Sequence, residues 1–154
     1  MGFTQIFFVL LLSTYNLIFL PYYKLKKLER VTKEIIVEFI HNNEIELGST
    51  HAKLCLPVIN RIFKKMSAGI KFSGIKVESN LICDGHHRYI ASILANFPLE
   101  RIPGSITSAT TAVSWESVTF EDEDWDTQAK INMLNEQDAK YNNIPIAQIV
   151  ELLQ

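Results

Sequence analysis

The first part of the globular chain alternates apolar and polar positions, a spacing typical of strands. Between Val31 and Leu47, the apolar residues Ile35, Val37 and Phe39 fall at every second position. This pattern predicts a strand with one buried face. Residues 44–47 alternate again and predict a second short strand, after which a Gly-Ser-Thr sequence breaks the chain.

A helical spacing replaces this alternation at Pro57. Proline suits the first position of a helix, where its missing N–H is not needed, and Gly69 is placed to end the helix. Apolar residues between them recur every three or four positions. The basic residues Arg61, Lys64 and Lys65 fall on the opposite face. This face is expected to be solvated, with a phosphate-facing role as the alternative.

The rest of the chain predicts short strands and helices separated by turn residues. Strands are expected at 75–77, 81–83, 102–106 and 115–120, and helices at 86–97, from a cap at 126–127 to about 141, and at 146–152. Pro103 places the third of these strands at a sheet edge or a kink. Together these elements predict an α+β domain over residues 31–154, with a small mixed sheet, helices packed on it and a C-terminal helical extension.

A hydrophobic segment precedes this domain. Residues 2–23 carry no charge, and at about 1.5 Å per residue a helix of this length could cross a hydrocarbon core of ~30 Å. Basic residues follow at once, from Lys24 to Arg30, and none precedes the segment. We therefore expect a membrane anchor at residues 1–23, with the domain in the cytoplasm. A cleaved secretory signal and a soluble segment packed on the domain are the alternatives.

Composition excludes several classes of protein. The chain has 154 residues, 47% of them hydrophobic, and a net charge of −2, which is unlike a disordered chain. Its two cysteines, Cys55 and Cys83, form no disulfide framework and are expected to be small core residues. The charge is uneven, since residues 24–76 hold 11 bases and 5 acids, whereas residues 77–154 hold 4 bases and 12 acids. The basic part could attract phosphates or a membrane surface.

The sequence Asp-Gly-His-His-Arg at 84–88 lies between a predicted strand and a predicted helix. Asp84 is a favourable N-cap residue, and Gly85 permits a sharp turn and the close approach of a ligand. The first N–H groups of a helix carry partial positive charge and bind anions. Arg88 could hold a phosphate with two hydrogen bonds, or could instead pair with Asp84 one turn away.

His86 and His87 are the candidates for acid–base chemistry near neutral pH, with Asp84 orienting a histidine or a metal. Neighbouring residues point about 100° apart on a helix, so both rings cannot reach one ligand unaided. For the same reason the two histidines are a poor zinc pair, and no metal-ligand set is assigned. The structural alternative is that Asp84 only caps the helix.

The order of elements and the sequence DGHHRYIA resemble the ParB/sulfiredoxin-like superfamily, over about residues 31–108. ParB-type domains carry G-E-R-R-x-x-A at a helix start, and sulfiredoxins carry G-C-H-R-Y. The matching positions are Gly85, Arg88 and Ala91 for the first pattern, and Gly85, His87, Arg88 and Tyr89 for the second. His86 replaces the cysteine that sulfiredoxin chemistry requires, so a reductase activity is not expected.

The resemblance implies that a nucleotide of the ATP or CTP type, with Mg²⁺, or another phosphate binds at the start of this helix. Gly85, His87 and Arg88 would bind the phosphate, and His86, His87 and Asp84 would catalyse phosphoryl transfer or phosphate-ester hydrolysis. A non-catalytic regulatory module is one alternative. A ParB-like nuclease or toxin domain is another, with a nucleic-acid surface formed by Arg61, Lys64, Lys65, Lys71 and Lys76.

Overall fold

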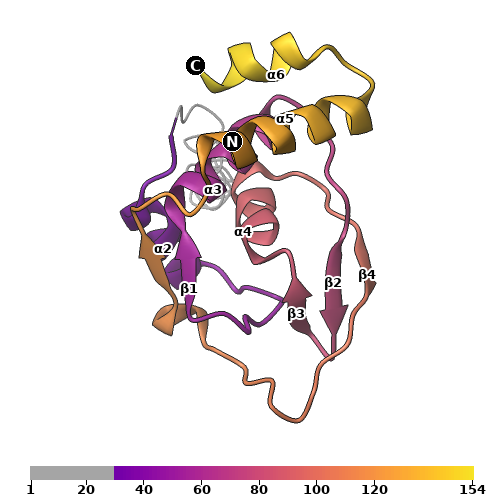
Figure 1. Ribbon diagram of the computed structural model, residues 1–154. Coiled ribbons are helices and arrows are strands. Elements are labelled where there is room, and N and C mark those ends of the chain that lie inside the picture. Colours follow the sequence, from indigo (N-terminus) through magenta and orange to yellow (C-terminus); the bar gives the residue numbers. More distant parts are fainter. Residues whose placement is uncertain (1–29) are drawn as a thin grey trace, which may run out of the picture.

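The computed structural model describes residues 30–154, and the hydrophobic helix predicted at residues 1–23 lies outside this range. Helices and short strands alternate along the described chain (Figure 1). In order they are α2 (Lys33–Asn42), β1 (Lys53–Cys55), α3 (Leu56–Ser67), β2 (Ile75–Glu78), β3 (Leu81–Asp84), α4 (His86–Ala95), β4 (Arg101–Pro103), the 3₁₀ helix η1 (Trp115–Ser117), β5 (Thr119–Glu121), α5 (Gln128–Asn142) and α6 (Ile146–Leu153). None of the helices in residues 30–154 is long and apolar enough to cross a bilayer.

The strands form two small sheets. β1 and β5 pair in parallel, with Leu54 opposite Phe120. The other sheet has the order β3-β2-β4 and is mixed, because β2 is antiparallel to β3 and parallel to β4. Pro103 lies in β4, an edge strand, as its missing N–H predicts. The α+β class, with helices and a small mixed sheet, is confirmed.

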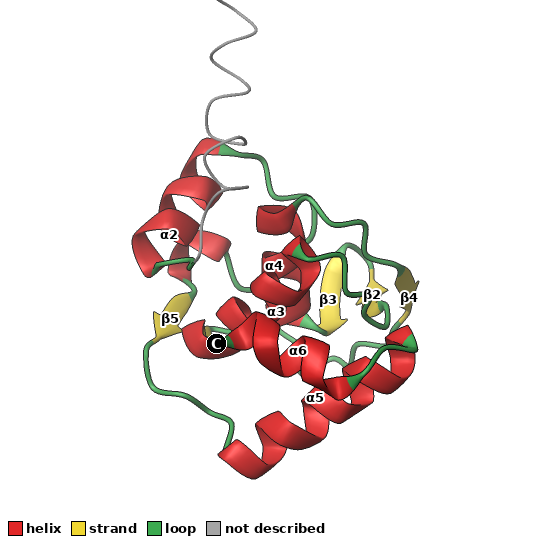
Figure 2. Ribbon diagram, turned by 90° about the horizontal axis from the view of Figure 1, so that it is seen from above, coloured by secondary structure: helices red, strands yellow, loops and turns green. Residues whose placement is uncertain are grey.

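α4 lies in the middle of the molecule, between the two sheets (Figures 1 and 2). Ile90 and Leu94 of α4 are buried in the same core cluster as Ile59 and Phe63 of α3. Burial of apolar surface is the main favourable contribution to folding, so this α3–α4 contact fixes the position of α4. The start of α4, where the DGHHR sequence lies, is thereby held at a defined place.

α5 and α6 lie side by side at one end of the molecule, above α3 and α4 in Figure 1. A second, smaller core cluster joins them to the rest through Ile70, Ala139 and Ile149. The side chain of Thr127 accepts a hydrogen bond from an N–H in the first turn of α5, and Asn143 ends the helix in a left-handed conformation. The predicted C-terminal helices are therefore confirmed.

The strand predicted within residues 31–47 is wrong, because α2 occupies most of this segment. The run of apolar residues satisfies both the strand and the helix spacing. Thr32 caps the helix, and Ile36 and Ile40, four positions apart, are buried. Val37, which the alternation would place on the buried face, is 48% exposed. The N-cap and the four-residue spacing decided the local structure.

Three other strand predictions need correction. Residues 44–47 form no strand, and the segment 115–120 is divided between η1 and β5. The strand predicted at 102–106 is shorter and begins one residue earlier, as β4. β1 was not predicted, because three residues are too few to show an alternation.

Candidate functional site

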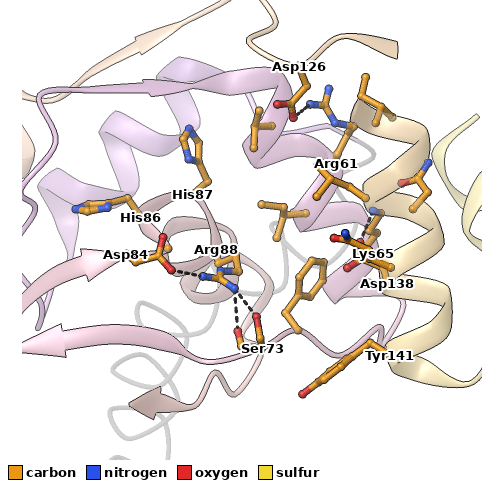
Figure 3. Close-up of a pocket in the computed structure, with 18 of the residues that line it drawn as sticks. Arg61, Lys65, Ser73, Asp84, His86, His87, Arg88, Asp126, Asp138 and Tyr141 are labelled. Atoms are coloured by element: carbon orange, nitrogen blue, oxygen red, sulfur yellow. Dashed lines mark hydrogen bonds and ion pairs between the residues drawn. The ribbon is translucent and has the colours of Figure 1, made fainter. Parts of the chain in front are cut away.

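A pocket of about 470 Å³ opens at the N-terminal end of α4 (Figure 3). Residues 84–88, the complete DGHHR sequence, line one side of it. α3 and α5 supply the other walls, so segments far apart in the sequence meet here. Sites for small ligands commonly enclose about 300–1,000 Å³, and this pocket falls within that range.

Gly85 turns the chain from β3 into α4. Its φ of 96° lies in the left-handed region, which glycine adopts readily and other residues do not. A Cβ atom at this position would lie 2.5 Å from Cγ2 of Ile75 and 2.9 Å from Nη2 of Arg88. Gly85 is also the N-cap of α4, and no side chain caps this end, so the prediction that Asp84 caps the helix is wrong. Among the residues that the structure describes, the first N–H groups of α4 therefore have no side-chain acceptor.

Arg88 lies across the Gly85 turn and is held at both ends of its guanidinium. Nη1 donates to Oγ and to the carbonyl oxygen of Ser73, at 2.5 and 3.3 Å. Nη2 donates to Oδ2 of Asp84 at 3.1 Å, so the alternative interpretation of an Asp84–Arg88 pair is confirmed as a contact (Figure 3). A guanidinium has five N–H groups, and these bonds leave donors for an anion.

His86 is almost completely buried and accepts a backbone hydrogen bond. Its Nε2 lies 3.1 Å from the backbone nitrogen of Thr50, which donates to it. The ring stacks on that of His51, with centroids 3.9 Å apart. Burial, followed by the nearby His51 and His87, lowers the pKa of His86 to about 4. The neutral ring carries its hydrogen on Nδ1, which is buried and has no partner within residues 30–154.

His87 also accepts a backbone hydrogen bond through Nε2, from the N–H of Cys55 at 2.9 Å. Its ring and that of Trp125 are nearly perpendicular, with centroids 5.5 Å apart. Burial, followed by His51, lowers the pKa of His87 to about 4. At neutral pH both histidines are therefore neutral, and both Nε2 lone pairs are occupied by backbone donors.

The geometry separates the three residues that the sequence suggested for catalysis. Asp84, His86 and His87 all line the pocket. Within the described residues, however, the hydrogen-bond partner of the Asp84 carboxylate is Arg88, and not a histidine. The two histidines face different backbone segments, as expected for neighbours on a helix.

Ion pairs at the wall of the pocket join the basic helix α3 to the acidic C-terminal third of the chain (Figure 3). Arg61 donates to Asp124 at 2.5 Å and to Asp126 at 2.6 Å. Lys65, which is 4% exposed, pairs with Asp138 of α5 at 2.5 Å. The expectation that this face of α3 is solvated is therefore wrong for both bases. The uneven charge along the sequence is explained by the folding of the two parts against each other.

Several residues of the pocket were not identified from the sequence, and His51 and Asn135 are two of them. His51 precedes β1 in a short loop, and an isolated histidine in a loop gives no signal. Asn135 lies on the face of α5 that lines the pocket, and it is 6% exposed. The helix itself was predicted, but its weakly amphipathic sequence does not show which face is covered.

Within residues 30–154, no group of three or more histidine, cysteine or acidic side chains is arranged to hold a metal ion. Cys55 is buried, and Cys83 is partly buried; both are free thiols. Cys55 accepts a hydrogen bond from the N–H of Trp125 and lies behind His87, so it supports the pocket wall.

No known protein family, curated protein or solved structure matches this chain. What the pocket binds must therefore be inferred from the residues that line it.

Proposed function

We propose that this chain is a binding domain of the ParB/sulfiredoxin-like type, which holds the phosphate groups of a nucleotide at the start of α4. One observation carries the proposal. Gly85 directs the chain so that the uncapped N-terminus of α4 lines a pocket, and Arg88 is fixed across the same turn. Free helical N–H groups and a held guanidinium are complementary to a phosphate.

The other side of the pocket suits the organic part of such a ligand. Phe72, Ile131 and Leu134 contribute apolar lining, and Tyr141 adds an aromatic ring. Sites for small molecules typically combine an apolar lining with a few polar groups that set orientation. Magnesium carried with nucleotide phosphates takes carboxylate oxygens, and Asp84 is the exposed carboxylate beside the turn.

Binding is better supported than catalysis by His86 and His87. A general base must offer a lone pair to the proton that it removes. The Nε2 atoms of both rings already accept backbone hydrogen bonds, and the Nδ1 atoms of the neutral rings carry the hydrogen, so the general base for phosphoryl transfer or ester hydrolysis would have to be the exposed His51. The nuclease alternative is weakened as well, because Arg61 and Lys65 of the basic surface are ion-paired.

Ligand-dependent stabilisation of the full-length protein, purified in a non-ionic detergent, tests the proposal. ATP, CTP, GTP and inorganic tripolyphosphate are added, each with and without magnesium, and the thermal midpoint is measured. A ligand at about 100 times its dissociation constant should raise the free energy of unfolding by ~2.7 kcal/mol. Arg88→Ala should weaken the binding of every phosphate ligand by about 10- to 100-fold, as expected for hydrogen bonds to charged groups.

Arg101→Ala is the matched control. Arg101 makes a two-pronged ion pair with Glu46 on the surface, outside the pocket, so its loss should leave binding unchanged. Equal binding by the parent protein and Arg88→Ala would overturn the proposed site. Stabilisation by short DNA, with none by nucleotides or tripolyphosphate, would favour the nuclease alternative instead.

A further inference from the structure

Asn135 is a lining residue of the pocket and carries an unsatisfied polar atom. The residue is 6% exposed, and its Oδ1 atom is buried with no hydrogen-bond partner in the part of the chain that the structure describes. Buried polar atoms in native proteins are nearly always hydrogen-bonded, because an unsatisfied one is costly. Asn135 also lines the pocket that contains the start of α4.

The neighbouring polar residues of α5 are satisfied within the protein. Asp138 pairs with Lys65. Asn142 donates to the carbonyl oxygen of Lys71 and accepts from its N–H, at 2.9 and 2.7 Å. These contacts dock α5 without using Asn135. The buried carboxamide is therefore not explained by the attachment of α5 to α3.

The opposite walls of the pocket supply different chemistry. Figure 3 shows Asp84 and Arg88 on one side of the hollow and Asp138 and Tyr141, from α5, on the other. Asn135 belongs to α5, with the apolar Ile131 one turn before it in the same lining. A ligand with its phosphates on the α4 side would extend its organic part towards α5.

We propose that Asn135 reads the polar edge of a nucleobase and so sets the specificity of the pocket; this rests on the proposed binding of a nucleotide. A carboxamide offers an acceptor beside a donor. The complementary edge has an amino group next to an unprotonated ring nitrogen, as in adenine and cytosine. With the carboxamide turned towards the hollow, Oδ1 would accept from the amino group, and the amide nitrogen would donate to the ring nitrogen.

The test compares ligands that share the triphosphate and differ in this edge. The full-length protein is titrated with ATP, CTP, inosine triphosphate and inorganic tripolyphosphate. Inosine triphosphate differs from ATP in carrying an oxygen in place of the amino group. We expect ATP or CTP to bind about tenfold or more tightly than inosine triphosphate, since a two-bond contact to a base gives discrimination of this order.

Asn135→Leu removes the carboxamide and keeps the approximate size of the side chain. It should abolish the preference for ATP or CTP and leave tripolyphosphate binding unchanged. The thermal midpoint without ligand should be equal or higher, because an unsatisfied polar atom is removed. Asn135→Ala is the second variant, with the same expected loss of preference. Asn132→Leu, an exposed position on the same helix, is the matched control and should keep the parent preference.

Two results would overturn the role of Asn135. One is an unchanged preference in both Asn135 variants, and the other is equal binding of all four ligands by the parent. Failure of the phosphate site is distinguishable, because tripolyphosphate would then not bind the parent at all. In that case adenosine is titrated as well. If it binds the parent and not Asn135→Leu, Asn135 reads the base although the phosphate site is absent.

Discussion

Gly85 sets the geometry of the pocket at the scale of single residues. Its φ of 96° directs the chain from β3 into α4, and the space left by its missing side chain is occupied by Ile75 and Arg88. Both features require glycine, because another residue would be strained at this φ and its Cβ would collide with Ile75 and Arg88. A substitution here should therefore affect stability and ligand binding together.

We expect Gly85→Ala to lower the free energy of unfolding by about 2–4 kcal/mol, from left-handed strain together with overpacking. It should also weaken phosphate-ligand binding, because the Cβ would displace the Arg88 guanidinium. Urea unfolding and ligand titration measure the two effects. Gly69→Ala is the control, since Gly69 has a φ of 84° but no atom of residues 30–154 lies within 4 Å of the added Cβ.

Gly69→Ala should cost only the backbone strain, about 1–2 kcal/mol, and leave binding intact. Equal ligand affinity in Gly85→Ala and the parent would show that the position of Arg88 does not depend on this glycine.

The residues of the DGHHR sequence could be identified because they are adjacent in the sequence. Their hydrogen-bond partners could not, because most of them are distant. Asp84 and Arg88 lie four positions apart, and that pairing was foreseen. His86 and His87 bond to backbone groups of Thr50 and Cys55, 36 and 32 residues away. No local pattern encodes such contacts, so the occupied Nε2 atoms could not be predicted from the sequence.

At the scale of elements, α5 is attached to α3 chiefly through polar contacts and through the small cluster that it shares with α6. The Lys65–Asp138 pair is the most buried of these contacts, with 5% and 19% of the two side chains exposed. Removing one member of such a pair leaves a charge without its partner in a poorly solvated place. α5 should therefore loosen when this pair is broken.

We expect Lys65→Met to lower the free energy of unfolding by about 2–4 kcal/mol and to reduce hydrogen-exchange protection in α5 more than in α4. Lys53→Met is the control, because Lys53 pairs with Glu121 on the surface and its side chain is 65% exposed. That change should cost no more than about 1 kcal/mol. Unaltered protection of α5 in Lys65→Met would show that other contacts hold the helix.

The elements that were predicted correctly carry their own start and stop signals. Pro57 and Gly69 bracket α3, and Thr127 begins α5. α2 was misassigned because its apolar run satisfies both the strand and the helix spacing; the N-cap Thr32 and the burial of Ile36 and Ile40 distinguish the two. β1 pairs with a strand that follows it by more than 60 residues, and such pairing is invisible in a local pattern.

At the scale of the whole molecule, the uneven charge of the sequence becomes a set of contacts between its two parts. Arg61 meets Asp124 and Asp126, which follow it by 63 and 65 residues. The charge imbalance could be counted in the sequence. Which charges pair could not be predicted, because it depends on how α5 folds back over α3. Both the phosphate end of the pocket and the wall that carries Asn135 lie in residues 77–154, whereas Arg61 and Lys65 of the same lining come from the basic residues 24–76.

The two neutral histidines make the stability of the whole molecule depend on pH. In the unfolded chain a histidine binds a proton near pH 6.5, whereas the pKa values of His86 and His87 in the folded chain are about 4. Between these pH values the unfolded state binds more protons than the folded state. The contribution of the two histidines to the free energy of unfolding is therefore fully present above about pH 6.5, and it is lost as the pH falls towards 4.

Urea unfolding of the full-length protein at intervals from pH 7.5 to pH 4.5 should show this decline. The expected slope is about 1.4 kcal/mol per pH unit for each histidine. The carboxyl groups of Asp124 and Asp126 have lowered pKa values, so their contribution is lost only at more acidic pH. A His86→Gln/His87→Gln variant should be much less sensitive over this range, because glutamine can accept the same backbone hydrogen bonds without titrating. His41→Gln, at the exposed end of α2, is the control and should keep the parent slope. An equally steep decline in the double variant would assign the acid sensitivity to other groups.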